Sequence, residues 1–243
     1  MEWIIGCSGF SYKSWKPLFY PSKLPSTKWF EFYCEHFNTV ELNVTFYRFP
    51  KPGTLISWYK RSPKNFAFSV KAPRLITHYK QLIRSEDQLK EFYIACKKGL
   101  AEKLGPILFQ FPARFTYTEE RLQRILDTLD PAFTNVVEFR HNSWWDEKVY
   151  TLLKKHHIVF CSMSHPQLPD EVAGSGDYVY YRFHGVPDLY SSVYSDEEME
   201  RISNAISSVK DLKKAWCYFN NDINTAAIKN AKWLQAKVEQ KNK

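Results

Sequence analysis

The chain has 243 residues, 44% of them hydrophobic, 17% aromatic and 25% charged, and its formal net charge is +8 at pH 7. This composition is too apolar for a disordered chain, and only eight glycines exclude a collagen-like one. No apolar run reaches the roughly 18 residues of a membrane-spanning helix, and we expect no membrane partner. The start of the sequence has no secretory signal pattern, and five scattered cysteines without a C-x-x-C pair favour a reducing, cytoplasmic location.

Short runs rich in Val, Ile, Phe and Tyr predict eight β-strands along the chain. These runs are Trp3–Cys7, Thr39–Asn43, Phe66–Lys71, Ile107–Phe111, Val136–Arg140, Ile158–Cys161, Tyr178–His184 and Ala215–Asn221. Between them, apolar residues at spacings of three and four predict helices, and a shorter helix is expected near residues 51–61. Ser85 is predicted to be an N-cap, while Thr118 and Ser195 open the helices that follow them.

Alternation of strands and helices repeated eight times predicts the fold. It favours an α/β protein, a (β/α)8 TIM-type barrel forming a single domain over residues 1–243. A doubly wound open sheet is the competing architecture. Neither a G-x-G-x-x-G motif after the first strand nor a P-loop is present to support it.

Polar residues at the carboxyl ends of the strands predict a functional site, because catalytic groups of such barrels lie there. The pairs Glu41/Asn43, Glu138/Arg140 and Arg182/His184 are each two residues apart, so both members of a pair share one face of a strand. Buried charges are rare unless they are paired or functional, although a purely structural Glu138 pairing is also consistent with this pattern. The candidate residues are Glu41, Asn43, Tyr47, Lys71, His78, Gln110, Glu138, Arg140, Arg182, His184, Tyr190, Asn220 and Asn221.

Seven segments of the sequence, in order, resemble the YecE-like family, also called domain of unknown function 72. They are Cys7–Tyr12, Phe37–Pro50, Lys71–His78, Leu104–Pro112, Glu138–Trp144, Tyr181–Gly185 and Phe219–Asp222. The resemblance covers essentially the whole chain and implies a TIM-type barrel, but it supplies no activity. The sixth strand end, Cys161–Pro166, lacks the acidic residue expected there, which weakens any scheme with a third carboxylate.

The leading hypothesis for function is acid–base catalysis on a phosphate- or carboxylate-bearing small molecule. Cations outnumber carboxylates among the candidates, and arginine pairs bind such anions in a bidentate manner. Glu138 would be the general base or acid and His184 its proton partner, with Glu41 as a second catalytic carboxylate. Arg140 and Arg182 would clamp the anion, and the other candidates would line the substrate site.

Other functions remain open at this stage. A metal-dependent, nuclease-like phosphodiester hydrolase would need a divalent ion, and the histidines and glutamates present could hold one ion, although the sequence requires none. A glycosidase would use Glu41 and Glu138 as its carboxylate pair. A non-catalytic protein could bind an anionic metabolite or RNA at the barrel mouth.

The positive charge is concentrated in one part of the sequence. Residues 51–103 hold 12 basic and four acidic side chains. This excess could attract nucleic acid, or it could be a solvated helix face on which Lys90, Lys97, Lys98 and Lys103 serve solubility. The sequence leaves the oligomeric state open, as well as whether this region faces the barrel mouth.

Overall fold

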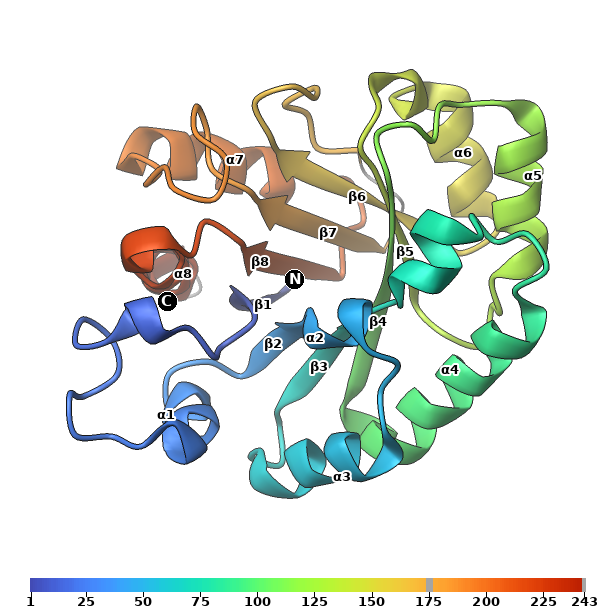
Figure 1. Ribbon diagram of the computed structural model, residues 1–243. Helices are drawn as coiled ribbons and strands as arrows, with labels where there is room; N and C mark the ends of the chain where they lie inside the picture. Colours follow the sequence, from blue (N-terminus) through green and yellow to red (C-terminus); the bar gives the residue numbers. More distant parts are fainter. Residues whose placement is uncertain (174–176, 242–243) are drawn as a thin grey trace. The chain divides into compact units, whose positions relative to one another are not determined.

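The predicted runs of apolar residues form parallel strands in the computed structural model, which describes residues 1–173 and 177–241 (Figure 1). The strands are β1 (Glu2–Ser8), β2 (Thr39–Leu42), β3 (Ala67–Lys71), β4 (Leu104–Phe111), β5 (Asn135–Phe139), β6 (Ile158–Ser164), β7 (Tyr178–Phe183) and β8 (Lys214–Phe219). Within the described residues they follow the order β1 to β8 of a closed barrel. The predicted (β/α)8 fold of the α/β class is therefore confirmed.

Helices alternate with these strands as the apolar spacing predicts. They are α1 (Trp29–Cys34), α2 (Val44–Tyr47), α3 (Pro52–Arg61), α4 (Glu86–Leu100), α5 (Glu119–Thr128), α6 (Glu147–Lys155), α7 (Asp196–Ser207) and α8 (Ala226–Lys241). The short elements that were not anticipated include α2 and the π-helical turn η3 (Leu75–Tyr79), which both follow closely on a strand end. None of the helices in the described ranges has the length and apolarity needed to cross a membrane.

Internal contacts divide the chain into two compact units. The terminal unit comprises Met1–Val40 and Ser162–Lys243, and the central unit comprises Glu41–Cys161. In the terminal unit β7, β8 and β1 pair side by side, and α8 packs on β8 and β1. In the central unit β3, β4 and β5 pair in succession, and α3 and α4 lie together on the outer side of these strands (Figure 1).

Aromatic rings fill the layer between strands and helices in both units. In the central unit the rings of Phe139 and Trp144 stack with centroids 3.9 Å apart. In the terminal unit Phe183 and Phe219 stack at 4.1 Å. Because successive side chains of a strand point to opposite faces, the residues next to these aromatics face the barrel interior. This alternation places polar candidate residues of the strands on the interior face.

The predicted helix starts are confirmed, but one cap bond does not form. The Thr118 hydroxyl accepts the Arg121 N–H, and Ser195 forms a reciprocal capping box with Glu198. Ser85 lies at the N-cap position of α4, yet its buried hydroxyl has no hydrogen-bond partner among the described residues. The structure thus supplies a matched pair of serines, one bonded as a cap and one not.

The interpretation of Lys103 as a solvated lysine of the basic region 51–103 is wrong. Its side chain is only 7% exposed, and its ammonium group donates to the carbonyl oxygens of Tyr59 and Ser62 and to the Ser62 hydroxyl. A buried ammonium needs such acceptors, so this lysine anchors the end of α3. Lys90, Lys97 and Lys98 are exposed, as expected.

Candidate functional site

Strand register in the central unit places three predicted residues on one face. Lys71 lies opposite Leu108 on β4, and Gln110 lies opposite Glu138 on β5. Since Leu108 and Gln110 are two residues apart, Lys71, Gln110 and Glu138 point to the same side of the sheet. Phe109 points to the other side, where its ring meets that of Tyr93 on α4. The polar face is therefore the one turned away from the helices.

Glu138 is a buried carboxylate on this face. Its side chain is fully buried, and Oε1 accepts a hydrogen bond of 2.5 Å from Nε of Arg140. The other carboxylate oxygen, Oε2, lies 3.9 Å from the Sγ atom of Cys161. Arg140 retains 12% side-chain exposure, so the pair reaches from the interior toward solvent. A short charge-assisted bond of this kind fixes the position of the carboxylate and places a guanidinium group directly beside it.

His78, on η3, lies in a cationic environment within the same unit. The pKa of His78 is lowered to about 4, first by burial and then by the charges of Lys71 and Arg114. Its ring meets Phe46 edge-on, and the Lys71 ammonium lies 4.3 Å from the centroid of that same ring. The imidazole is therefore neutral near pH 7, and the positive field around it favours a bound anion.

The remaining candidates of the central unit have different positions. Glu41 is fully buried on β2. Asn43 is half-buried and precedes α2, and its Oδ1 has no hydrogen-bond partner in the described part of the chain. Tyr47 closes α2 with 65% of its surface exposed, and its ring faces the guanidinium of Arg74 rather than Glu138. The structure thus associates Tyr47 with a surface and not with the buried cluster.

Register in the terminal unit aligns a second polar cluster. Arg182 lies opposite Tyr218 on β8, which in turn lies opposite Gly6 on β1. His184, Asn220 and Ser8 lie two residues farther along these three segments of the chain. They therefore share the face of Arg182. Arg182 and His184 are 1% and 0% exposed, so the face is buried.

The contacts within this second cluster hold His184 by both ring nitrogens. Its Nε2 is 3.5 Å from Nη1 of Arg182, and its Nδ1 is 3.1 Å from Nδ2 of Asn220. Nη2 of Arg182 also reaches the Ser8 hydroxyl at 3.4 Å. The imidazole is oriented by these neighbours, and the guanidinium beside it is charged at any ordinary pH.

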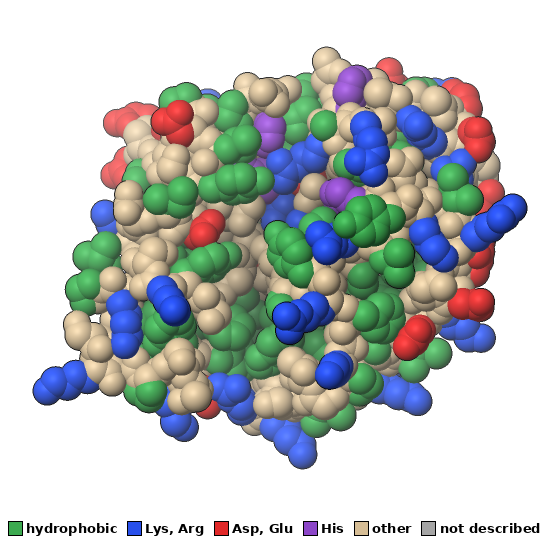
Figure 2. Space-filling view, viewed as in Figure 1, with side chains coloured by type: hydrophobic (Ala, Val, Ile, Leu, Met, Phe, Trp, Pro, Cys, Tyr) green, Lys and Arg blue, Asp and Glu red, His purple; other side chains and the backbone are tan. Residues whose placement is uncertain are grey.

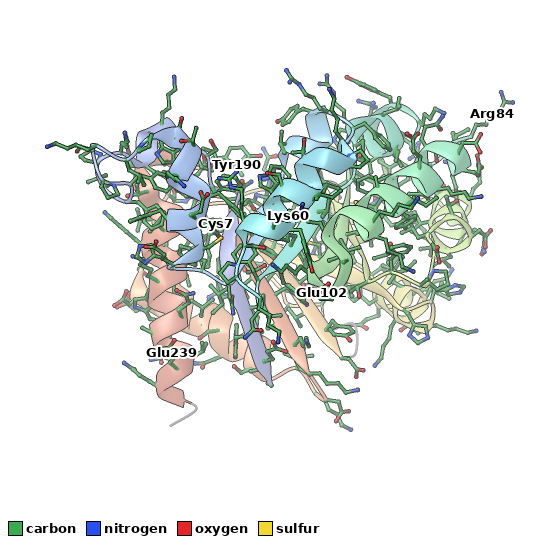
Figure 3. All side chains as sticks on the ribbon, turned by 90° about the horizontal axis from the view of Figure 1, so that it is seen from below. Cys7, Lys60, Arg84, Glu102, Tyr190 and Glu239 are labelled. Atoms are coloured by element: carbon green, nitrogen blue, oxygen red, sulfur yellow. The ribbon has the colours of Figure 1, made fainter. Side chains whose placement is uncertain are left out.

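A tight turn after β7 closes over His184. The His184 carbonyl accepts a 2.6 Å bond from the backbone N–H of Tyr190, and Gly185 between them has φ = +91°. The Tyr190 ring, 40% exposed, meets the imidazole edge-on at 6.1 Å, and Figure 3 labels this tyrosine. His165 approaches from another side, with its ring centroid 5.9 Å from that of His184. Tyr190 therefore lies beside His184.

Two residues at the strand ends do not join these clusters. The amide of Asn221 donates to the Ser192 carbonyl and to Asn230, on the side away from His184, so its contacts hold loops in place. Cys7 (Figure 3) is buried on β1, and burial raises the pKa of its thiol far above the usual range. This agrees with an inert thiol.

The two clusters include residues that sequence reasoning did not select. Ser8 could have been found by applying the two-residue spacing to the end of β1, because it is in line with Asn220. Cys161, likewise, is in line with Glu138 across β5 and β6. Arg114 follows β4 in a loop, where no periodicity indicates a direction, and only the fold reveals its contact with the His78 carbonyl.

The described residues contain no group of three or more His, Cys, Asp and Glu side chains arranged to hold a metal ion. The histidines of the two clusters are instead surrounded by arginine, lysine, asparagine and aromatic side chains.

Comparison with known proteins gives a whole-chain family match. The sequence profile of a family described as protein of unknown function DUF72 matches residues 4–243. UPF0759 protein YunF of Bacillus subtilis is 26% identical over 248 residues, covering 88% of each chain. UPF0759 protein YecE of Escherichia coli K12 is 37% identical over 112 residues, which cover 46% of this chain and 41% of YecE.

A solved structure has the same fold. The crystal structure of a DUF72 family protein from Thermotoga maritima superimposes with a TM-score of 0.90, at 26% sequence identity, and the match covers 98% of this chain and 100% of the other. The likeness extends over the whole barrel, and neither the family description nor these relatives' names state a reaction.

Proposed function

Since the chain belongs to the DUF72 family, whose description names no reaction, we propose a function from the side chains themselves: acid–base catalysis on an anionic small molecule carrying phosphate or carboxylate. The reaction takes place at the carboxyl ends of the barrel strands. Glu138 is the group that moves the proton, and arginines bind the anion.

The observation that carries this proposal is the buried Glu138–Arg140 pair next to a cationic environment. A carboxylate at 0% exposure keeps its charge only beside a strong partner, which the 2.5 Å bond from Arg140 supplies. Burial is the largest cause of the low pKa of His78, and the charges of Lys71 and Arg114 lower this pKa further, so positive charge is in excess around the ring. An incoming anion would reduce this excess, and its binding is therefore favoured.

The roles follow from where each group can exchange a proton. When an anion engages Arg140, the Arg140 bond to Glu138 weakens and the carboxylate becomes a stronger base toward a substrate C–H or O–H. Lys71 supplies a second positive charge. For the terminal unit the same reasoning assigns Arg182 as an anion ligand and His184, held by Asn220, as a group that exchanges a proton.

Inorganic phosphate and the imidazole of His78 give a direct test of anion binding. Phosphate near Lys71 and Arg140 stabilises the imidazolium, so the pKa of His78 should rise from its value of about 4 as phosphate is added. Titration of His78 by NMR, with increasing phosphate, measures this rise. Arg140→Gln should weaken phosphate binding by at least about tenfold, because a charged hydrogen bond contributes roughly 1.5–3 kcal/mol.

Lys148→Gln is the matched control, because Lys148 is an exposed cation on α6 paired with Glu119. Its phosphate response should equal that of the wild type. The proposed anion site is contradicted if the pKa of His78 does not change with phosphate. It is also contradicted if phosphate raises this pKa equally in the wild type and in Arg140→Gln.

The catalytic part is tested by turnover of a panel of phosphate esters and carboxylates. Glu138→Gln should lower kcat by about 100-fold or more while phosphate binding persists, as expected for loss of a general acid–base group. Phosphate binding accompanied by no wild-type turnover across the panel would favour a non-catalytic binder of an anionic metabolite.

A further inference from the structure

One continuous stretch of the chain has no acidic residue at all. From Leu42 to Ser85 the sequence contains nine Lys and Arg residues and no Asp or Glu. This stretch includes α2, α3, β3 and η3, so the imbalance lies within the central unit. Figure 2 shows basic and hydrophobic side chains interspersed over α2 and α3. Such a surface repels other cations and attracts polyanions.

At the surface of this stretch, two exposed tyrosines flank one arginine. The Arg74 guanidinium carbon lies 5.8 Å from the ring centroid of Tyr47 and 5.6 Å from that of Tyr79. Tyr47 is 65% exposed and Tyr79 is 63% exposed. A guanidinium between two rings orients both of them at low entropic cost, because each tyrosine has few rotatable bonds. We call Tyr47, Arg74 and Tyr79 the aromatic platform.

The surroundings of the platform are apolar and basic. Val44 and Leu75, on the same elements as the two tyrosines, are 50% and 42% exposed. Farther along the chain Lys80 and Arg84 follow η3, and Figure 3 shows Arg84 at the periphery. Exposed apolar and aromatic groups that gather among charged residues are typical of a surface that binds a partner.

We propose that the aromatic platform binds single-stranded nucleic acid, with bases stacking on Tyr47 and Tyr79 and phosphates contacting Arg74 and its basic neighbours. Exposed aromatic rings favour a single strand, because the bases of a single strand have open faces for stacking and the bases of a duplex do not. An acidic protein would satisfy the charges, but its carboxylates do not stack on tyrosine rings, whereas every base of a nucleic acid has a face that does. This inference is independent of the proposed catalytic function.

Binding of fluorescein-labelled oligothymidylate and oligouridylate, followed by fluorescence anisotropy, tests the proposal. Tyr47→Ala and Tyr79→Ala should each weaken binding by at least about fivefold, since one base–aromatic stack contributes roughly 1–3 kcal/mol. Tyr47→Phe and Tyr79→Phe keep the ring and should bind like the wild type. Arg74→Ala should lower the slope of log affinity against log salt by about 0.7, as for one lost phosphate contact on a single strand.

Lys213→Ala is the control for charge, because Lys213 lies in the terminal unit and pairs with Asp177. It should leave binding within about twofold. Circular dichroism of each variant verifies the fold. Three results would overturn the proposal: no binding at low salt, tighter binding of duplex than of single strands, or equal affinities of the alanine and phenylalanine variants. The last result, together with displacement by polyglutamate, would indicate a surface for acidic protein instead.

Discussion

At the end of β7, Gly185 combines φ = +91° with a close approach of neighbouring backbone. A Cβ at this position would lie 2.7 Å from the carbonyl oxygen of Asp188. We expect Gly185→Ala to lower the free energy of unfolding by roughly 1–3 kcal/mol, because both backbone strain and steric overlap are introduced. Chemical denaturation followed by circular dichroism measures this change.

Gly53 provides the matched control for this substitution. It lies within α3, and a Cβ there would meet no atom within 4 Å. Gly53→Ala should therefore raise the free energy of unfolding by about 0.5–1 kcal/mol through higher helix propensity. Equal effects of the two substitutions would show that the turn over His184 does not depend on the backbone of Gly185.

At the scale of a helix, the two serines at N-cap positions separate a bonded cap from an unbonded one. Ser195→Ala removes the hydroxyl that accepts the Glu198 N–H in the α7 capping box, although the backbone N–H of residue 195 can still donate to the Glu198 carboxylate, and should destabilise the protein by about 1 kcal/mol. Ser85→Ala removes a buried hydroxyl that bonds no described group, so its effect should be near zero or slightly stabilising. Urea denaturation of both variants checks the difference, and a larger loss for Ser85→Ala would contradict the assignment.

Sequence periodicity predicted the long elements well and the short ones poorly. Most strands, and helices of two or more turns, carry enough apolar positions to reveal their period, which is why β5 and α4 were expected near their observed bounds. The four residues of α2 and the five of η3 span barely one turn and carry no readable period. These two elements hold Phe46, Tyr47 and His78, so their surroundings could not be predicted.

The candidate residues show the same division. Residues on strands were predictable because spacing by two fixes a common face, as for Glu138 with Arg140 and Arg182 with His184. Residues in loops were not: Arg114 was missed, and Asn221 directs its amide to Ser192 and Asn230 instead of His184. Loop direction depends on tertiary packing, which adjacent sequence does not encode.

For the molecule as a whole, the reaction rates of the five cysteine thiols measure how rarely the fold opens. All are thiols, and Cys7, Cys96, Cys161 and Cys217 are buried, whereas Cys34 is half-buried. Burial raises the pKa of Cys96 to about 12 and those of Cys7 and Cys217 farther. Because the thiolate is the reactive form, a disulfide reagent at pH 8 should label one cysteine per native chain quickly.

Cys34→Ser should remove this fast reaction, while all five thiols of the wild type should react in strong denaturant. The four slow thiols should then follow opening of the fold. More than one fast thiol in the native wild type would contradict their burial.

The sequence also indicated the architecture of the whole chain, because eight alternations of strand and helix leave few folds to choose from. Seven segments in order led to the same family that the sequence profile identifies. Architecture does not carry a reaction, since one barrel supports many chemistries through different groups at its strand ends. The reaction therefore has to be argued from side chains at the strand ends, and our proposal assigns it to Glu138, His184 and their neighbours.

The Glu138–Arg140 pair has a consequence for how such proteins diversify. Both partners are carried by one short stretch of backbone, so covalent geometry sets their separation, and the surrounding loops do not. Insertions or exchanges in those loops would leave the two residues at the same spacing along the backbone. An engineer could therefore exchange the loops and still keep this carboxylate–guanidinium pair.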